Sequence, residues 1–262
     1  MGIDFAVIGG TGVDHPDLLG TRRRERVDTP YGMTVLTVGE ISNARVAFVS
    51  RHGEEHSVPP HLVNYRANIW ALKELGVKKI IATAAVGSLQ AKFAPGQFVL
   101  VDQFLDFTKS RQATFFTGDK GVLHVDMTDP YCGELRGLIA AAAAAAGVGV
   151  LNGGTYVCTE GPRFETPAEI RMFRALGGEL VGMTSVPEVV LAKECGMCYA
   201  AIAMVTNYAA GISETALSHQ EVVERMASMD VKLRELLAAV LRVLTPERSC
   251  ACPQAGAELG KF

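Results

Sequence analysis

Short apolar runs alternate with stretches of helical periodicity along most of the chain. The apolar runs are typical of strands that helices cover on both faces, and they fall at residues 5–8, 45–50, 79–83, 97–101, 154–158 and 198–205. Apolar residues recur at helical spacing over residues 63–75, 138–146, 167–176, 186–194 and 220–244. This alternation predicts a single α/β domain with a central mixed, largely parallel sheet flanked by helices.

The predicted domain extends over residues 1–246. A chain of 262 residues is long enough for one large α/β domain or two small ones, and the absence of a linker between the periodic segments favours one. The periodicity fades beyond Pro246. Residues 247–262 are therefore expected to form a poorly ordered C-terminal tail.

Charge and hydropathy exclude several kinds of partner. The formal net charge is -3, with acidic and basic residues mixed along the chain, so no surface for nucleic acid or an anionic membrane is expected. No run approaches the roughly 18 to 20 apolar residues of a membrane span. Residues 1–10 resemble a buried strand rather than a signal peptide, because they lack a basic segment and a cleavage site. The expected location is the cytoplasm.

The six cysteines are too few for a secreted disulfide framework in a chain of this length. Cys195 and Cys198 have the spacing of a redox or metal pair, but no second pair or histidine lies nearby at ligand spacing. No metal site is therefore predicted. Cys250 and Cys252 lie in the expected tail, where exposure to solvent is favoured over a redox-sensitive clip.

Residues suited to an anion follow the first two predicted strands. Residues 9–12 (Gly-Gly-Thr-Gly) allow backbone amides to approach a ligand. Arg51 and His52 follow the second strand, and a guanidinium group matches the geometry of phosphate. Because ligands bind at the carboxyl ends of parallel strands, an anion site is expected here. The alternative is a solvated loop over residues 51–56.

Two further strand ends carry small or polar residues. Residues 84–88 (Ala-Ala-Val-Gly-Ser) permit close approach of a ligand, and Asn207 comes directly after the strand at 198–205. The amide of Asn207 is a candidate reader of a polar ligand, with a turn cap as the alternative. The sequence contains no Ser-His-Asp order and no His-Glu-x-x-His pattern. Catalysis would therefore come from positioning and from stabilising a leaving group.

Five motifs together carry a resemblance to a known family. They are Ile8-Gly-Gly-Thr-Gly12, Arg51-His-Gly53, Val63-Asn-Tyr-Arg-Ala-Asn-Ile-Trp-Ala-Leu72, Glu160-Gly-Pro-Arg-Phe-Glu-Thr166 and Gly182-Met-Thr-Ser-Val-Pro-Glu188. From about Phe5 to Leu244 the chain resembles the trimeric purine nucleoside phosphorylase and methylthioadenosine phosphorylase family. The resemblance implies phosphorolysis, in which inorganic phosphate is a co-substrate, no cofactor is used, and a nucleoside yields a free purine and a sugar 1-phosphate.

The same resemblance implies roles for particular residues. Phosphate would be held by Thr11, Arg51, His52, the backbone of Ala84 and Ala85, and Thr184. Met183 would pack against the ribose and Phe164 against the purine. Ala84 departs from the Thr or Asn of relatives, so a side-chain contact to phosphate or sugar is expected to be missing.

The purine-reading positions indicate the 6-oxopurine branch. The methylthioadenosine branch carries two aspartates after the last strand, in a pattern similar to Thr-Asp-Tyr-Asp, whereas this chain has Asn207, Tyr208 and Ala209. It also has Glu165 where that branch usually has Ser. A 6-oxopurine presents an acceptor O6 and a donor N1–H. Asn207 would donate near N7 and O6 and Glu165 would accept from N1, acting with Arg51 as the catalytic groups.

The resemblance also implies that two histidines contact the sugar, one of them from a neighbouring subunit. His219 aligns with the histidine that reads a 5′-hydroxyl, and His124 would reach the sugar pocket of a neighbouring subunit. A homotrimer or a dimer of trimers is therefore implied. The alternatives are a phosphorylase for methylthioinosine or methylthioadenosine, a non-catalytic nucleoside-binding protein, and a structural subunit.

Overall fold

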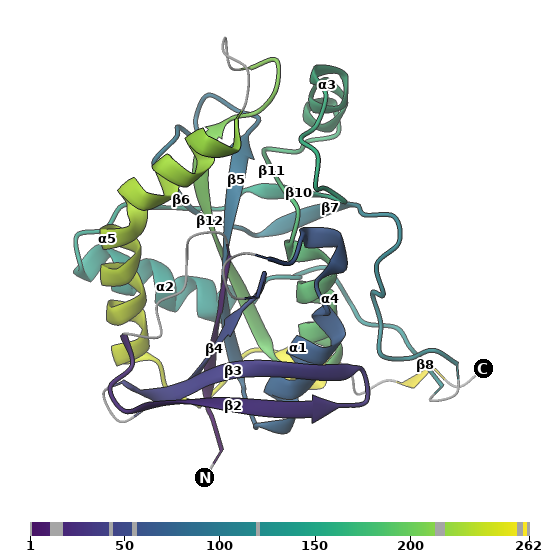
Figure 1. The fold of residues 1–262 in the computed structure, drawn as a ribbon, viewed down its shortest axis with the longest axis vertical. Helices are drawn as coiled ribbons and strands as arrows, with labels where there is room; N and C mark the ends of the chain where they lie inside the picture. Colours follow the sequence, from purple (N-terminus) through teal and green to yellow (C-terminus); the bar gives the residue numbers. More distant parts are fainter. Residues whose placement is uncertain are drawn as a thin grey trace.

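A computed structural model describes residues 2–10, 18–41, 44–53, 57–118, 121–212, 218–255 and 259–260. In this part of the chain, eleven strands form one mixed sheet (Figure 1). They are β1 (Phe5–Gly9), β2 (Arg22–Thr29), β3 (Gly32–Ile41), β4 (Ala44–Ser50), β5 (Lys79–Ser88), β6 (Phe98–Leu100), β7 (Gln103–Phe107), β9 (Val150–Asn152), β10 (Thr155–Thr159), β11 (Leu180–Gly182) and β12 (Cys198–Tyr208). The helices are α1 (Tyr65–Glu74), α2 (Gly133–Ala145), α3 (Pro167–Ala175), α4 (Ser185–Glu194) and α5 (His219–Val243).

The sheet is centred on β5. Residues 79–82 of β5 pair in parallel with β1, and Gly87 and Ser88 pair antiparallel with β11. β12 runs parallel to β5 along the other edge, so β1 and β11 share a single edge of β5. The sheet therefore divides beyond Ala82, with β1 and β4 on one side of the division and β11 and β10 on the other.

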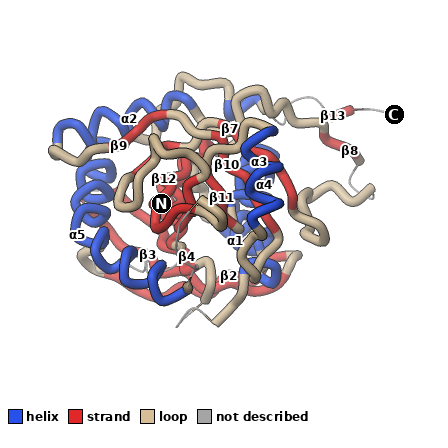
Figure 2. The backbone as a smooth tube through the Cα atoms, turned by 90° about the horizontal axis from the view of Figure 1, so that it is seen from above, coloured by secondary structure: helices blue, strands red, loops and turns tan. Residues whose placement is uncertain are grey.

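Helices cover both faces of the central strands. Figure 2 shows α2 and α5 on one side and α1 and α4 on the other. The side chains of β12 alternate between two apolar clusters: Tyr199 and Ala201 pack with α1 and α4, whereas Ala200 and Ile202 pack with α2 and α5. This burial on both faces is why β12 has an uninterrupted apolar sequence. The predicted α/β class is confirmed.

Several elements differ from the sequence-based boundaries. β5 and β12 continue to Ser88 and Tyr208, so residues 84–88 and Asn207 belong to strands rather than to the loops after them. The pairing of β12 with β5 shifts register between Val205 and Asn207, and such a bulge redirects the side chains beyond it. The β2–β3 hairpin was not predicted, because its mixed polar and apolar residues leave no apolar run. None of the helices in the described ranges is long and apolar enough to cross a membrane.

The segment after α5 differs from the expected poorly ordered tail. Residues 252–254 form a 3-10 helix, and Cys252 is buried. Arg248 donates to the carbonyl oxygen of Gly196 at 2.8 Å, and Lys79 Nζ donates to the carbonyl oxygen of Glu247 at 2.7 Å. These contacts hold residues 247–255 against the core. Periodicity did not reveal them because they join single residues to distant elements.

Candidate active site

A cavity of about 370 Å³ lies where the sheet divides. Its volume is within the range of small-molecule sites, about 300–1,000 Å³. Most of the predicted site residues line it, from the carboxyl-terminal parts of five strands or the loops after them and from the start of α5: Arg51, His52, Ala84, Ala85, Phe164, Glu165, Met183, Thr184, Asn207, Ala209 and His219. The fold thus brings together residues that are up to 168 positions apart, from Arg51 to His219.

Two predicted site residues that the structure describes, Tyr208 and His124, do not line this cavity. Thr11 lies outside the described residues. Tyr208 is absent from the lining, but its carbonyl oxygen accepts a hydrogen bond from Asn207 Nδ2 at 2.9 Å. His124 is exposed and follows β8 (Val122–Leu123), a strand that lies at the periphery in both views (Figures 1 and 2). The predicted role of His124 in a neighbouring subunit stays a prediction.

Arg51 is the buried cation of the cavity. Its Nε and one Nη donate to the two carboxylate oxygens of Glu188 at 2.8 and 2.7 Å, and the other Nη donates to the carbonyl oxygen of Thr83 at 2.8 Å. Burial disfavours the guanidinium charge, but attraction to Glu188 outweighs this effect and raises the pKa of Arg51 above its usual range. A guanidinium has five N–H groups, so these contacts leave two for a ligand.

Gly10 and Thr184 line the cavity together with Arg51, and these three residues form a candidate anion cradle. The N–H of Gly10 donates to Thr83 Oγ1 at 3.0 Å. A Cβ at Gly10 would lie 2.8 Å from the carbonyl oxygen of Thr83 and 3.1 Å from a guanidinium nitrogen of Arg51, so a side chain there would displace the cradle. Thr184 is buried, and its backbone N–H donates to the hydroxyl of Tyr156 at 3.3 Å, so its side-chain hydroxyl is the group that can reach an anion in the cavity.

His52 is buried beside the same cradle. Its Nδ1 lies 2.9 Å from the carbonyl oxygen of Val58. Because a carbonyl oxygen only accepts, Nδ1 carries a proton and the ring orientation is fixed.

Glu165 and Asn207 supply a carboxylate and an amide to the wall of the same cavity, and both are buried. Glu165 Oε1 accepts a hydrogen bond from Thr159 Oγ1 at 2.7 Å, and burial raises the pKa of Glu165. Thr206 Oγ1 donates to Asn207 Oδ1 at 2.7 Å. The amide is thereby oriented with Nδ2 as its donor, and one of the two N–H bonds of Nδ2 is used by the carbonyl of Tyr208.

Apolar groups and a histidine complete the lining. Phe164 is 38% exposed, as expected of a ring that closes on a ligand rather than on the core. Gly161 has φ +67°, and a Cβ there would lie 2.6 Å from Met183 Sδ, so glycine permits the close approach of these two loops. His219 is exposed and is the first residue of α5.

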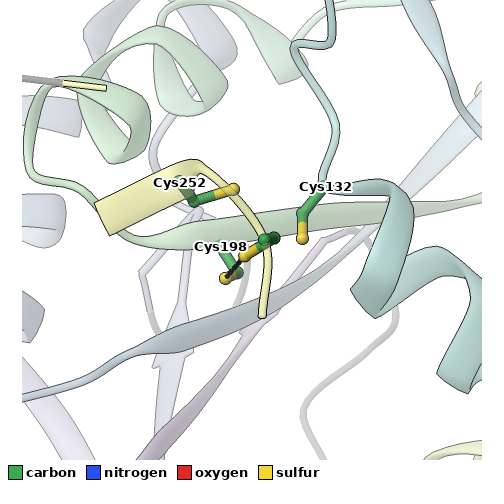
Figure 3. A group of neighbouring side chains, drawn as sticks. Cys132, Cys198 and Cys252 are labelled. Carbon is green, nitrogen blue, oxygen red and sulfur yellow. Dashed lines mark hydrogen bonds between the residues drawn. The ribbon is translucent and has the colours of Figure 1, made fainter. Parts of the chain in front are cut away.

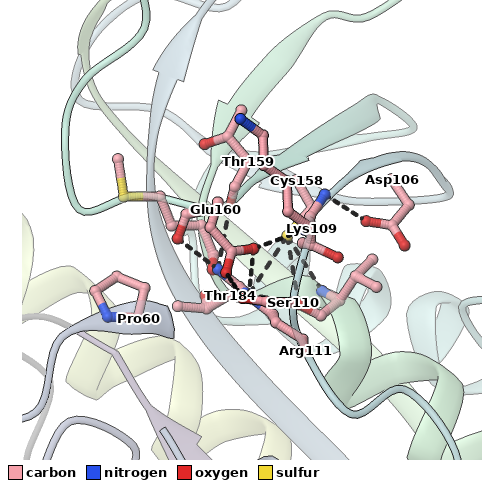
Figure 4. Close-up of polar contacts among 12 residues, drawn as sticks. Pro60, Asp106, Lys109, Ser110, Arg111, Cys158, Thr159, Glu160 and Thr184 are labelled. Atoms are coloured by element: carbon pink, nitrogen blue, oxygen red, sulfur yellow. Dashed lines mark hydrogen bonds and ion pairs between the residues drawn. The ribbon is translucent and has the colours of Figure 1, made fainter. Parts of the chain in front are cut away.

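Arg111 is a buried residue near the site that the sequence analysis missed. Its guanidinium donates to the carbonyl oxygens of Met183 at 2.7 Å, Val186 at 2.6 Å and Glu160 at 2.8 Å. It also donates to the carbonyl oxygen of Thr159 at 3.1 Å (Figure 4). Arg111 thus ties together the two loops that supply Glu165 and Met183. The only signal in the sequence was the length of the polar segment from residue 102 to 129.

Glu188 was also not assigned a role, although it ends one of the quoted motifs. It is fully buried and accepts from Arg51 and, at 2.7 Å, from the hydroxyl of Tyr199. A buried carboxylate requires a partner of opposite charge. This rule identifies Glu188 as the partner of Arg51 only once the fold has brought them together.

Comparison with known proteins shows the family to which the chain belongs. The family described as the Phosphorylase superfamily matches residues 4–242. A protein of Moorella thermoacetica named probable 6-oxopurine nucleoside phosphorylase is 56% identical, over 97% of this chain and 98% of its own length. One of Methanothermobacter thermautotrophicus named probable S-methyl-5′-thioinosine phosphorylase is 53% identical, over 96% of this chain and 88% of its own length.

A solved structure shares the fold. Methylthioadenosine phosphorylase from Schistosoma mansoni in complex with adenine superposes with a TM-score of 0.91 and 36% identity, covering 97% of this chain and 96% of that one. The similarity to members of this family, in sequence and in fold, thus extends over nearly the whole chain. The chain belongs to the phosphorylase superfamily.

Proposed function

We propose that this protein is a purine nucleoside phosphorylase that cleaves 6-oxopurine nucleosides such as inosine and guanosine. Phosphate displaces the purine from the sugar, which gives the free base and ribose 1-phosphate in purine salvage. The enzyme is then a pentosyltransferase. The observation that carries the proposal is the presence of Glu165 and the oriented amide of Asn207 in one cavity with the buried cation Arg51.

The chemistry of the base explains this preference. A 6-oxopurine offers an N1–H donor to the Glu165 carboxylate and acceptors at O6 and N7 to Asn207 Nδ2. A 6-aminopurine offers an acceptor at N1 and a donor at the amine, so both contacts would be mismatched. Each unsatisfied buried group costs about 1–3 kcal/mol, and such mismatches discriminate strongly between ligands.

The mechanism requires positioning rather than a protein nucleophile. Arg51, the Gly10 region and Thr184 would hold phosphate against the anomeric carbon of the sugar. As the glycosidic bond breaks, the sugar gains oxocarbenium character and the purine gains negative charge. The free N–H of Asn207 would stabilise that charge at N7 and O6, while Glu165 would keep the N1 proton in place.

Assembly is part of the proposal. His124 is exposed and is not in the lining of its own cavity, which is consistent with a role in the sugar pocket of a neighbouring subunit. We therefore expect a homotrimer or a dimer of trimers. Separation by size coupled to light scattering tests this expectation.

The second candidate is methylthioinosine phosphorolysis. It shares the 6-oxopurine contacts, and one of the similar proteins carries that name. The difference lies at the 5′ position of the sugar, where His219 lines the cavity. An imidazole can hydrogen-bond a 5′-hydroxyl, whereas a methylthio group offers only a weak acceptor, so inosine is favoured.

The test is a release assay with inosine, guanosine, adenosine, methylthioinosine and methylthioadenosine, each with and without phosphate. Phosphate-dependent release of hypoxanthine and guanine supports the proposal. Preference for methylthioadenosine would overturn the assignment of Glu165 and Asn207. Preference for methylthioinosine would retain that assignment and overturn the role of His219. Binding without base release would identify a non-catalytic protein.

A further inference from the structure

Four cysteines from three separate segments meet beside the start of β12. Cys132 is the N-cap of α2, Cys198 is the first residue of β12, and Cys250 and Cys252 lie in the segment after α5. Their four sulfur atoms all lie within 4.8 Å of one another. Figure 3 shows Cys132, Cys198 and Cys252 gathered from these segments.

The cluster is shielded from solvent. Cys132, Cys198 and Cys252 are buried, and Cys250 is half-buried. The cysteines do not line the candidate active site. The spacing of Cys195 and Cys198 had pointed to a different pair, but Cys195 lies outside the cluster. The chemistry of these thiols is therefore separate from phosphorolysis and needs its own explanation.

All four sulfur atoms are close enough to one another to bind a single metal ion. A tetrahedral site with metal–sulfur bonds of about 2.3 Å has sulfur–sulfur edges of about 3.8 Å. The sulfur atoms of Cys198 and Cys250 are 3.3 Å apart, and every pair lies within 4.8 Å, so shifts of about 1 Å would give that geometry. In two separate disulfides each sulfur atom needs only one close partner, whereas here each of the four sulfur atoms is close to the other three.

Groups around the cluster suit bound thiolates. The backbone N–H of Leu135 donates to Cys132 Sγ at 3.5 Å, at the N-terminus of α2, and helix N-termini and N–H donors stabilise thiolates. Lys79 is the register partner of Cys198 on β5 and is fully buried. Its ammonium group is paired with Glu134 at 3.7 Å and donates to the carbonyl oxygen of Glu247 at 2.7 Å, so it helps to hold α2 and the segment after α5 next to the cluster.

We propose that Cys132, Cys198, Cys250 and Cys252 bind one zinc ion. Four S–H bonds give way to four zinc–sulfur bonds and the protons leave to solvent, so the step needs no oxidant or reductant. Four protein ligands leave no open position, which defines a structural site. The ion joins the segment after α5 to α2 and β12.

The test uses full-length protein purified under reducing conditions without oxygen. We expect one zinc ion per chain by elemental analysis. Replacement by cobalt should give the thiolate charge-transfer and ligand-field absorption of tetrahedral cobalt. Cys252→Ser should weaken cobalt binding by more than about 100-fold, since even loss of an outer-shell contact costs about 10- to 100-fold. Cys195→Ser is the matched control and should bind cobalt as the wild type does.

Circular dichroism establishes that both variants are folded, so lost binding is attributable to the ligand. Two results would overturn the proposal. One is metal-free protein that gives no cobalt spectrum while all six cysteines titrate as thiols in denaturant. The other is a peptide map in which Cys132, Cys198, Cys250 or Cys252 is linked by a disulfide under the same conditions.

Discussion

Arg51 and Glu188 form a two-point ion pair inside the protein, with nitrogen–oxygen distances of 2.8 and 2.7 Å and side chains that are 1% and 0% exposed. Arg163 and Glu169 also form a two-point pair, on the surface, at 2.9 and 2.7 Å. Arg51 donates through Nε and one Nη and Arg163 through both Nη atoms, but the distances are nearly equal and the main difference between the pairs is burial. They therefore separate the contribution of burial from that of contact.

Glu188→Gln should lower the free energy of unfolding by about 3–5 kcal/mol, because it leaves the Arg51 charge buried without a counter-charge. It should also raise KM for phosphate, since Arg51 loses the group that orients it. Denaturant unfolding and initial-rate kinetics measure these effects. Glu169→Gln is the control and should change neither quantity appreciably, because solvent screens an exposed pair. Equal effects of the two changes would show that burial is irrelevant here.

The pH dependence of activity should report Glu165. Burial raises the pKa of this carboxyl, and the ionised form is the one that accepts a hydrogen bond from the N1–H group of the base. We expect kcat/KM for inosine to fall on the acid side at a pH above the ordinary glutamate pKa of about 4.3. Glu165→Gln should lower kcat/KM and remove this acid limb.

Glu165 should make the free energy of unfolding change with pH in the direction opposite to that of kcat/KM. Because its pKa is raised in the folded state, the folded protein binds more protons than the unfolded chain between the two pKa values. The free energy of unfolding therefore decreases as pH rises through that interval. Glu194 is the matched control, since burial also raises its pKa and it accepts from Thr114 outside the cavity. Glu194→Gln should alter stability and leave the acid limb of kcat/KM in place.

Asn207→Asp should replace the amide donor that faces the base with a carboxylate acceptor. With inosine, a carboxylate meets the acceptors O6 and N7, so kcat/KM should fall by about 10- to 100-fold, which corresponds to about 1.4–2.7 kcal/mol. With adenosine it should rise relative to inosine. Asn152→Asp, at an exposed position in β9, should leave both values unchanged. Wild-type kinetics in Asn207→Asp would remove Asn207 from the site.

Arg111 should act by positioning the two loops that it joins. Arg111→Lys keeps the charge but cannot donate to four carbonyl oxygens in the fork geometry of a guanidinium. We expect kcat for inosine to fall about tenfold or more, with partial rescue by added guanidinium ion. Arg26→Lys, on an exposed strand, is the control. Lack of rescue together with a global loss of stability would indicate a role in folding alone.

Much of the candidate site could be predicted because each group follows a recognisable element. Arg51 follows an apolar strand, Glu165 precedes a helix with a Thr166 cap, and Asn207 lies near the end of the most apolar strand. Local pattern therefore located these residues even where the strand boundaries were wrong by a few positions.

Other features depend on contacts between distant segments. Arg111 binds carbonyl oxygens of residues 159–186, and backbone carbonyls carry no sequence signal. The cysteine cluster combines Cys132 with residues 66 and 118 positions later, Cys198 and Cys250. The sequence analysis considered only the pairs Cys195 and Cys198, and Cys250 and Cys252, because these are close along the chain, and it predicted no metal site.

The two halves of the candidate site are joined through β5, because β1 and β11 pair with different parts of the same edge of this strand. Arg51 follows β4 on the β1 side, whereas Glu165 follows β10 on the β11 side, and both sides are paired to the same edge of β5. In the proposed site, the spacing between the phosphate group and the purine therefore depends on the geometry of β5 between its two partners. Substitutions within β5 are expected to change this spacing without removing the groups that would recognise phosphate and base.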